Sequence, residues 1–231
     1  MIGPRLSQIA AAVPQGLRVA DIGCDHAYLV IELVKSGHCP WAVASDINAG
    51  PLEAARQNVR RAGLTDKIEL RLGSGLSVLS PGEVEAAVIA GMGGALMADI
   101  LGQGREVVGK LQVLVVSPNV APWLVRRWAA DTGCAVADEK VVEEANHFYE
   151  ILTLRPQHQG ALLNDAEIWF GPKLLHAQDA LTTRYFAERR ETDERKLSAL
   201  AAVRTTHKEA AEEFDRLTAL WKQWEAERAC R

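Results

Sequence analysis

Two carboxylates beside a single glycine are the residues best placed to do chemistry in this chain: Asp21 and Asp25 flank Gly23. Glycine has no Cβ, so the backbone there can adopt a positive φ and approach a ligand closely. The turn lacks the second glycine of the G-x-G-x-x-G motif that the pyrophosphate of NAD needs, and Asp25 stands where phosphates would lie. A ligand with an amino acid group fits better, because either carboxylate could pair with an ammonium group. S-adenosylmethionine is such a ligand; an ordinary strand–turn–helix of any α/β domain is the alternative.

Other polar or glycine-rich positions follow further predicted strands. Asp46 lies about 20 residues past the glycine turn, where a carboxylate commonly accepts hydrogen bonds from ribose hydroxyls. Capping of the next helix by Asp46 or Asn48 is the alternative. The Ser74-Gly75 loop would face an adenine, or it is a plain turn. Three glycines within 91–94 predict a floor where the backbone approaches the cofactor and a substrate base; a tight turn under a packed helix is the alternative.

These positions need a scaffold of alternating strands and helices. The mostly apolar run 17–22 predicts a buried parallel strand, with a helix over 27–34 after it. The other predicted strands cover 41–46, 68–72, 84–90 and 111–116, with an antiparallel pair, 135–142 and 148–154, closing the sheet. The other predicted helices cover 5–13, 51–62, 95–101 and 123–128. The prediction is an α/β fold of the Rossmann-like class I methyltransferase type, with a seven-stranded, mostly parallel sheet. Its order should reverse where the fourth strand lies beside the first, and ligands bind there.

The pattern changes after Arg155, where no further strand signals occur. The sequence predicts a long helix over 174–202, a turn at 205–207 and a second helix over 208–228. Apolar and aromatic residues recur at spacings of three and four: Leu200, Val203, His207, Ala210, Phe214, Leu217, Trp221 and Trp224. We favour a helical hairpin over one continuous helix, because two helices can bury each other's stripes. The expected domains are 1–158 for catalysis and 159–231 as a coiled-coil hairpin, which grips a large substrate or serves as a dimer arm.

Paired arginines, Arg126 and Arg127, lie between Trp123 and Trp128 on the helix after the fifth strand. Arginines between aromatic residues can hold phosphates and stack bases. They can equally belong to a helix with its aromatic face in the core and its charges in water, and this interpretation is slightly favoured.

Composition limits the remaining possibilities. The 231 residues carry a formal net charge of -4, so no global basic field indicates a nucleic-acid partner. No apolar run is long enough to span a membrane, and the N-terminal residues lack the apolar core of an export signal. The four cysteines form no C-x-x-C pair, and the six histidines show no ligand spacing. We expect a cytoplasmic protein with free thiols, no metal site and no membrane contact, and a monomer rather than a dimer.

Several segments together resemble one known family. The segments DIGCDHAYL, GMGG, SPN and FYEIL, followed by FGP and a coiled C-terminus, resemble the bacterial tRNA adenine-22 N1-methyltransferase family over essentially the whole chain. The resemblance implies a class I S-adenosylmethionine-dependent fold, a helical C-terminal domain that binds tRNA, and methylation of N1 of an adenine in the D-loop region. Two positions depart from the family pattern. Asp46 stands where glutamate is frequent, which the chemistry tolerates, and Ser117 stands where glutamine is frequent, which leaves the role of residue 117 open.

The resemblance also assigns site residues. Those implied for the cofactor are Asp21, Gly23, Cys24, Asp46, Ile47, Ser74, Gly75, Gly91, Met92 and Gly93. Those implied for catalysis at the target base are Asp25, His26, Tyr28 and Asn119. The chain lacks the Asn-Pro-Pro-Tyr signature of enzymes that methylate exocyclic amines, which fits attack by a ring nitrogen.

Three other functions compete with this one. The main alternative is a class I methyltransferase acting on a small molecule, with the C-terminal hairpin as a dimer arm. An RNA-binding module that retains an old cofactor fold would bind tRNA without S-adenosylmethionine. A nicotinamide-dependent dehydrogenase is disfavoured, because the second glycine is missing.

Overall fold

The computed structural model describes residues 2–229 and divides the chain into two compact units, Met1–Leu162 and Leu163–Arg231. The first unit holds the whole sheet and the second is entirely helical. Among the described residues, no helix is both long and apolar enough to cross a bilayer.

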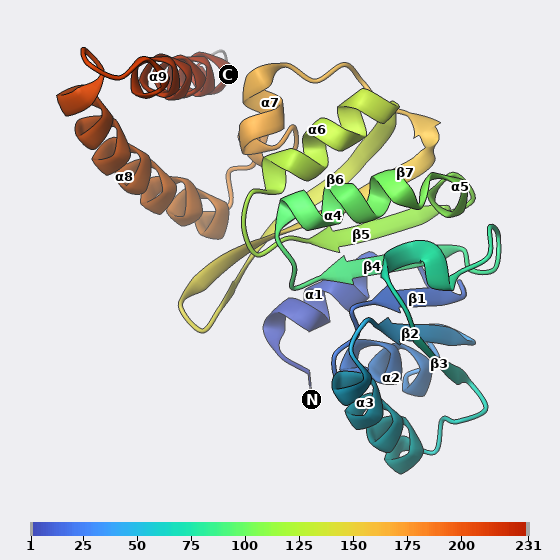
Figure 1. Cartoon of the computed structure of the whole chain (residues 1–231). Helices are drawn as coiled ribbons and strands as arrows, with labels where there is room; N and C mark the ends of the chain where they lie inside the picture. Colours follow the sequence, from blue (N-terminus) through green and yellow to red (C-terminus); the bar gives the residue numbers. More distant parts are fainter. Residues whose placement is uncertain (1, 230–231) are drawn as a thin grey trace. The chain divides into compact units, whose positions relative to one another are not determined.

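The sheet of the first unit has seven strands in the order β3-β2-β1-β4-β5-β7-β6 (Figure 1). Five strands run parallel: β1 (Val19–Ile22), β2 (Ala42–Asp46), β3 (Ile68–Leu72), β4 (Ala86–Ala90) and β5 (Val113–Ser117). The last two, β6 (Cys134–Glu144) and β7 (His147–Gln159), are antiparallel. The predicted seven-stranded fold is therefore confirmed, and β4 lies beside β1 as expected.

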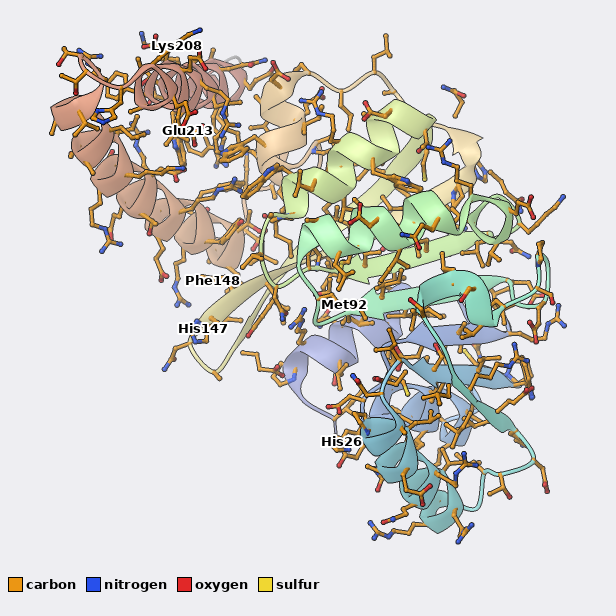
Figure 2. All side chains as sticks on the ribbon, viewed as in Figure 1. His26, Met92, His147, Phe148, Lys208 and Glu213 are labelled. Carbon is orange, nitrogen blue, oxygen red and sulfur yellow. The ribbon has the colours of Figure 1, made fainter. Side chains whose placement is uncertain are left out.

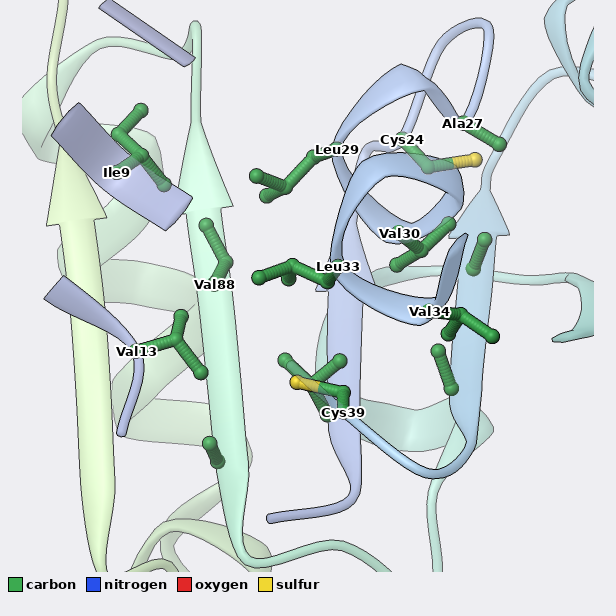
Figure 3. Packing of buried hydrophobic residues seen from close by; sticks show 14 of the residues in the cluster. Ile9, Val13, Cys24, Ala27, Leu29, Val30, Leu33, Val34, Cys39 and Val88 are labelled. Atoms are coloured by element: carbon green, nitrogen blue, oxygen red, sulfur yellow. The ribbon is translucent and has the colours of Figure 1, made fainter. Parts of the chain in front are cut away.

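Helices cover both faces of this sheet, and successive strand residues point to opposite faces. Val88 of β4 belongs to the core with α1 (Pro4–Ala12), α2 (Tyr28–Lys35) and α3 (Ala49–Ala62). Figure 3 shows Ile9, Val13 and Leu33 gathered around Val88. Its neighbour Ile89 belongs to the other core, with α4 (Gly94–Gln103) and α6 (Pro122–Thr132). The short elements η1 (Gly75–Val78) and α5 (Arg105–Val108) were not predicted.

The end of the first unit differs from the prediction. Strand β7 continues past Arg155 to Gln159, so the statement that no strand follows Arg155 is wrong. Pro156 is tolerated there because the register of β6 and β7 shifts between Cys134 and Ala135, which leaves Pro156 without a ladder partner. The break between the units then falls after Leu162 instead of after residue 158.

The second unit is a helical hairpin, as predicted. It contains α7 (Asp165–Phe170), a short turn η2 (Leu174–His176), α8 (Ala180–Val203) and α9 (Lys208–Ala229). The predicted helix over 174–202 begins only at Ala180, because Asp179 caps it by accepting from the N–H of Thr182. Helix α7 was not predicted, although Asn164 and Glu167 form a capping box at its start.

The two long helices of this unit pack along part of their length. Lys196 pairs with Glu213 at 2.7 Å and Arg190 with Glu225 at 2.7 Å, which fixes α8 and α9 as antiparallel neighbours. Phe170, Phe186, Trp221 and Trp224 form an aromatic core between the helices. The predicted apolar stripe holds at Leu217 and Trp221, which are buried, and fails at Val203 and His207, which are exposed near the turn.

Candidate active site

The turn after β1 is held in an unusual backbone conformation. The N–H groups of Gly23 and Cys24 both donate to the carbonyl of Ser45, each at 2.8 Å, which ties the turn to β2. Gly23 has a φ of 78°, and Asp25 and Ala27 are also left-handed, with φ of 50° and 58°. Such conformations are costly for residues with a side chain and cluster at functional sites.

Asp46 braces the same turn from the end of β2. Its carboxylate accepts the N–H of Asp25 at 3.3 Å and the N–H of Asn48 at 2.8 Å. Asn48, and not Asp46, is the N-cap of α3, and no side-chain capping bond forms there. Of the two capping candidates, Asn48 takes the N-cap position and Asp46 does not. Asp46 instead links the turn after β1 to the turn after β2.

A cavity of about 220 Å³ opens between the ends of β1 and β4. It brings together seven of the predicted site residues: Asp21, Gly23, Cys24, Asp25, His26, Tyr28 and Gly91. His26 lies 3.5 Å from the Asp25 carboxylate, and its ring centroid lies 5.5 Å from that of Tyr28. Figure 2 labels His26 and, on the loop after β4, Met92. A Cβ on Gly23 would overlap the flexible end of the Met92 side chain, which can move aside, so the left-handed φ of 78° is the stronger reason for glycine here.

The loops after β4 and β5 are clasped together beside this cavity. The N–H of Gly91 donates to the carbonyl of Ser117 at 3.2 Å, and the N–H of Asn119 donates to the carbonyl of Met92 at 2.8 Å. The Asn119 side chain adds a bond from its Nδ2 to the carbonyl of Gly91 at 2.7 Å. Gly94 has no room for a side chain, because a Cβ there would overlap the carbonyl of Ala121. The glycine run is therefore a close approach of two backbones.

Burial gives Asp21 a special charge state. Its side chain lies at the floor of the cavity and is almost completely buried. Burial, reinforced by the nearby charge of Asp46, raises the pKa of Asp21 to about 7. The site can therefore present a neutral or an ionised carboxyl near neutral pH. A ligand that carries an ammonium group would favour the ionised form.

Comparison with known proteins decides the family. Residues 2–152 match the family described as Methyltransferase domain. The tRNA (adenine(22)-N(1))-methyltransferase of Bacillus subtilis (strain 168) is 35% identical over 184 residues, which are 78% of this chain and 77% of that protein. This chain belongs to the same family.

Solved structures of family members share the whole architecture. The B. subtilis m1A22 tRNA methyltransferase TrmK superimposes with a TM-score of 0.83 at 29% identity, over 95% of this chain and 98% of that one. M. capricolum TrmK, in complex with the cofactor product S-adenosyl-homocysteine, gives a TM-score of 0.83 at 27% identity, over 97% and 98% of the two chains.

Not every predicted residue of this methyltransferase lies at the small cavity. Ser74 and Gly75 line a separate cavity of about 450 Å³ beside η1. The carbonyl of Ser74 accepts the Ser77 hydroxyl at 2.6 Å, as in a plain turn. Ile47 is 65% exposed after Asp46. A larger cavity of about 750 Å³ lies against α4, α5 and α6 and contains none of the predicted site residues.

Arg126 is not available to a phosphate. It is fully buried and pairs with Glu139 at 2.6 Å and with Glu150. The interpretation that placed its charge in water is wrong as well, because two buried carboxylates neutralise it inside the protein. Its neighbour Arg127 is exposed and lines the larger cavity.

Two charged cavity residues were missed by sequence reasoning: Arg5 and Glu144. Arg5 lies in the first turn of α1 and Glu144 ends β6, so neither follows a parallel strand, where ligand residues are sought. The open question about Ser117 is also answered. It is fully buried, donates its hydroxyl to the carbonyl of Glu150 at 3.0 Å, and accepts from Arg5 Nε at 3.0 Å.

One cysteine, Cys24, lines the small cavity. Cys24, Cys39 and Cys134 are free and buried, while Cys230 lies outside the described residues. Burial raises the pKa of the Cys24 thiol well above its usual range, so it is a poor nucleophile. Within residues 2–229, no three His, Cys, Asp or Glu side chains gather as metal ligands would.

The charge state of Asp21 predicts a pH dependence of stability. In the unfolded chain its carboxyl ionises with the ordinary aspartate pKa of 3.8, whereas in the folded protein the pKa is about 7. The folded protein therefore binds the extra proton, and its free energy of unfolding should fall as pH rises from about 4 to about 7. Urea denaturation across this range, compared between the wild type and Asp21→Asn, should show this fall in the wild type only. Equal slopes for the two proteins would contradict the assignment.

Proposed function

We propose that this protein transfers the methyl group of S-adenosylmethionine to N1 of adenine 22 in tRNA. The observation that carries the proposal is the acidic, left-handed turn after β1, which faces the glycine loop after β4 across the small cavity. Relatives with the same architecture are named for this reaction, and one is in complex with S-adenosyl-homocysteine.

The chain offers suitable groups for each part of S-adenosylmethionine. Asp21 and Asp25 would receive the ammonium of the methionine portion, and Asp46 would accept the ribose hydroxyls. The side chains of Ile47 and Leu72, 65% and 60% exposed, follow or end neighbouring strands and would cover the faces of the adenine. Exposed apolar groups beside buried carboxylates are the mixture that an adenosine with an amino acid tail requires.

The main task of the protein in this reaction is to position the methyl donor and the adenine. S-adenosylmethionine supplies a methyl group on a sulfonium, which is already a strong electrophile. N1 of neutral adenine has a free lone pair and needs no base, but the methylated ring is cationic. The Asp25 carboxylate would stabilise that developing charge, and Tyr28, whose ring is 51% exposed, would stack on the base. N1 lies on the pairing edge, so a paired target must first be unpaired or flipped.

We assign the second unit to tRNA binding. Its two long helices, of 24 and 22 residues, bury a shared aromatic core and so form a stable arm without a second chain. The self-contained arm supports a monomer. The tRNA substrate supports a location in the cytoplasm. The net charge of -4 restricts any basic tRNA-binding surface to local patches.

The direct test is transfer of labelled methyl from S-adenosylmethionine to unmodified bacterial tRNA, followed by mapping of the modified nucleotide. We expect label on N1 of adenine 22. Binding of S-adenosylmethionine with no label on any tRNA would favour the small-molecule methyltransferase. Removal of residues 163–231 gives a second comparison, because only a tRNA enzyme should lose substrate affinity when the remaining unit stays folded.

Asp25 should be essential for transfer and dispensable for tRNA binding. Asn tolerates the left-handed backbone at this position better than Ala does, so Asp25→Asn removes the charge with less strain than Asp25→Ala. We expect either variant to lower kcat by at least about 100-fold, the range typical of a lost electrostatic contact to the transition state. Filter binding of tRNA should change little. Full activity of Asp25→Asn would remove this carboxylate from the mechanism.

A further inference from the structure

Arg5 makes a set of contacts that sequence reasoning did not anticipate. From the first turn of α1, its guanidinium donates three hydrogen bonds to the last residue of β5 and the loop after it. Nε reaches Ser117 Oγ at 3.0 Å, Nη2 reaches the Ser117 carbonyl at 2.5 Å, and Nη1 reaches Asn119 Oδ1 at 2.8 Å. The guanidinium also lies over the ring of Tyr149, 4.0 Å from its centroid. Arg5 therefore joins the N-terminal helix, the β5 loop and the β6–β7 hairpin.

These contacts fix the orientation of the Asn119 amide. Its oxygen accepts from Arg5, and its nitrogen donates to the carbonyl of Gly91 at 2.7 Å. A flipped amide would place NH₂ against the guanidinium and oxygen against the Gly91 carbonyl, which is two repulsions in place of two hydrogen bonds. Arg5 and Gly91, the two ends of this chain of bonds, both line the small cavity.

The chemistry of Arg5 differs from that of a structural ion pair. Its guanidinium donates to neutral acceptors only, while Glu144 accepts from the backbone N–H of Arg5 at 3.2 Å. Burial lowers the pKa of Arg5, which the nearby charge of Glu144 only partly offsets, so holding a cation here costs free energy that a neutral residue would not. A guanidinium is nevertheless suited to this place, because its planar, forked set of donors can hold several acceptors at once.

We propose that Arg5 is a positioning residue for methyl transfer, which holds Asn119 and, through it, the Gly91 loop in the arrangement that the target base meets. The inference rests on the proposed function, because it assumes that the base enters beside these loops. Arg5 acts through Asn119 and does not itself need to touch the base.

A double-mutant cycle tests this coupling. Arg5→Met keeps an apolar stem and removes the fork, and we expect it to lower kcat for tRNA methylation by about 100-fold, as misplacement by about 1 Å can. The affinity for S-adenosylmethionine should change by less than about 3-fold, because the carboxylates of the β1 turn remain. Asn119→Ala should have a similar effect on kcat, and the double variant should be no slower than the slower single variant.

Two further variants separate positioning from charge and from folding. Arg5→Lys should stay impaired, because a compact ammonium cannot reproduce the planar fork. Arg18→Met is the matched control. Arg18 also forms a forked contact, to Glu85, but at the other end of β1, so its loss should leave kcat unchanged.

A spectroscopic measurement that needs no catalysis tests the role of Arg5 even if the proposed function is wrong. In ¹H–¹⁵N spectra, the side-chain NH₂ pair of Asn119, identified by its loss in Asn119→Ala, should shift strongly in Arg5→Met and remain in place in Arg18→Met. An unchanged pair, or additive losses of kcat in the cycle, would overturn the proposal. If the wild type methylates no tRNA, the proposed function fails, and the amide signal alone decides whether Arg5 positions Asn119.

Discussion

Replacing Asp46 with alanine should weaken S-adenosylmethionine binding by at least about 100-fold. The carboxylate accepts the N–H groups of Asp25 and Asn48, and the variant leaves both without that partner. Each unsatisfied group costs about 1–3 kcal/mol where water cannot replace the partner. The turn after β1 would also lose its link to β2, and the ribose hydroxyls would lose their proposed acceptor. The backbone losses act on the free and the bound protein alike, whereas two ribose hydrogen bonds to a carboxylate are made only with the cofactor. At about 1.5–3 kcal/mol each, and 1.4 kcal/mol per factor of ten, their loss accounts for about 100-fold or more in affinity.

Calorimetric titration with S-adenosylmethionine measures this effect, and two variants make it specific. Asp46→Glu keeps the carboxylate and should retain affinity within about 10-fold, a smaller loss than that of the truncation. Asp131→Ala removes a carboxylate from the cavity of about 750 Å³ and should leave affinity unchanged. The reverse pattern, loss with Asp131→Ala and none with Asp46→Ala, would place the cofactor in the larger cavity.

The sequence predicts the sheet well because its signals are local. Strands such as β1, β4 and β5 are buried on both faces and appear as continuous apolar runs between glycines and polar residues. The strand order then follows from the rule that consecutive βα units wind outward and reverse beside the first strand. Asp21, Gly23, Asp25 and Gly91 could be found by the same reasoning, since carboxyl ends of neighbouring strands must converge. Cys24, His26 and Tyr28 were implied as site residues only by the family resemblance.

The features that were missed depend on distant partners. Arg5 bonds to residues 112 and 114 positions away, and no local pattern marks an arginine in an amphipathic helix as part of a site. A proline has no N–H to donate to the neighbouring strand, so Pro156 indicates that a strand ends there. Only the register shift at Cys134 explains why β7 continues past it. Strand order alone predicts that Ser74 and Gly75 face the adenine. They line a separate cavity instead, because their position depends on how η1 packs against Ile100.

The arginine pair shows the same limit on a single helix. Arg126 and Arg127 are neighbours in sequence, yet one is fully buried and the other is exposed. Successive residues of a helix point in different directions. Arg126 is the one that faces the sheet, where β6 and β7 supply the carboxylates that pair with it. A buried arginine needs such partners, and Glu139 and Glu150 are recognisable as partners only once the hairpin is placed against α6.

Arg126→Met should therefore destabilise the first unit more than any surface change. Removing the cation takes away the ion-pair partner that both buried carboxylates share, and breaking a buried ion pair typically costs about 3–5 kcal/mol. For a chain of this size such a loss lowers the melting temperature by about 6–20 °C. Thermal unfolding followed by circular dichroism measures it, with Arg127→Met as the control that should shift little.

A triple variant distinguishes the ion pairs from the volume of the side chain. Arg126→Met with Glu139→Leu and Glu150→Leu removes all three charges and keeps an apolar filling of similar size. Because buried ion pairs pay a desolvation cost that apolar packing does not, this variant should recover most of the lost stability. Continued instability would show that the packing of the arginine stem, and not its charge balance, holds α6 against β6 and β7.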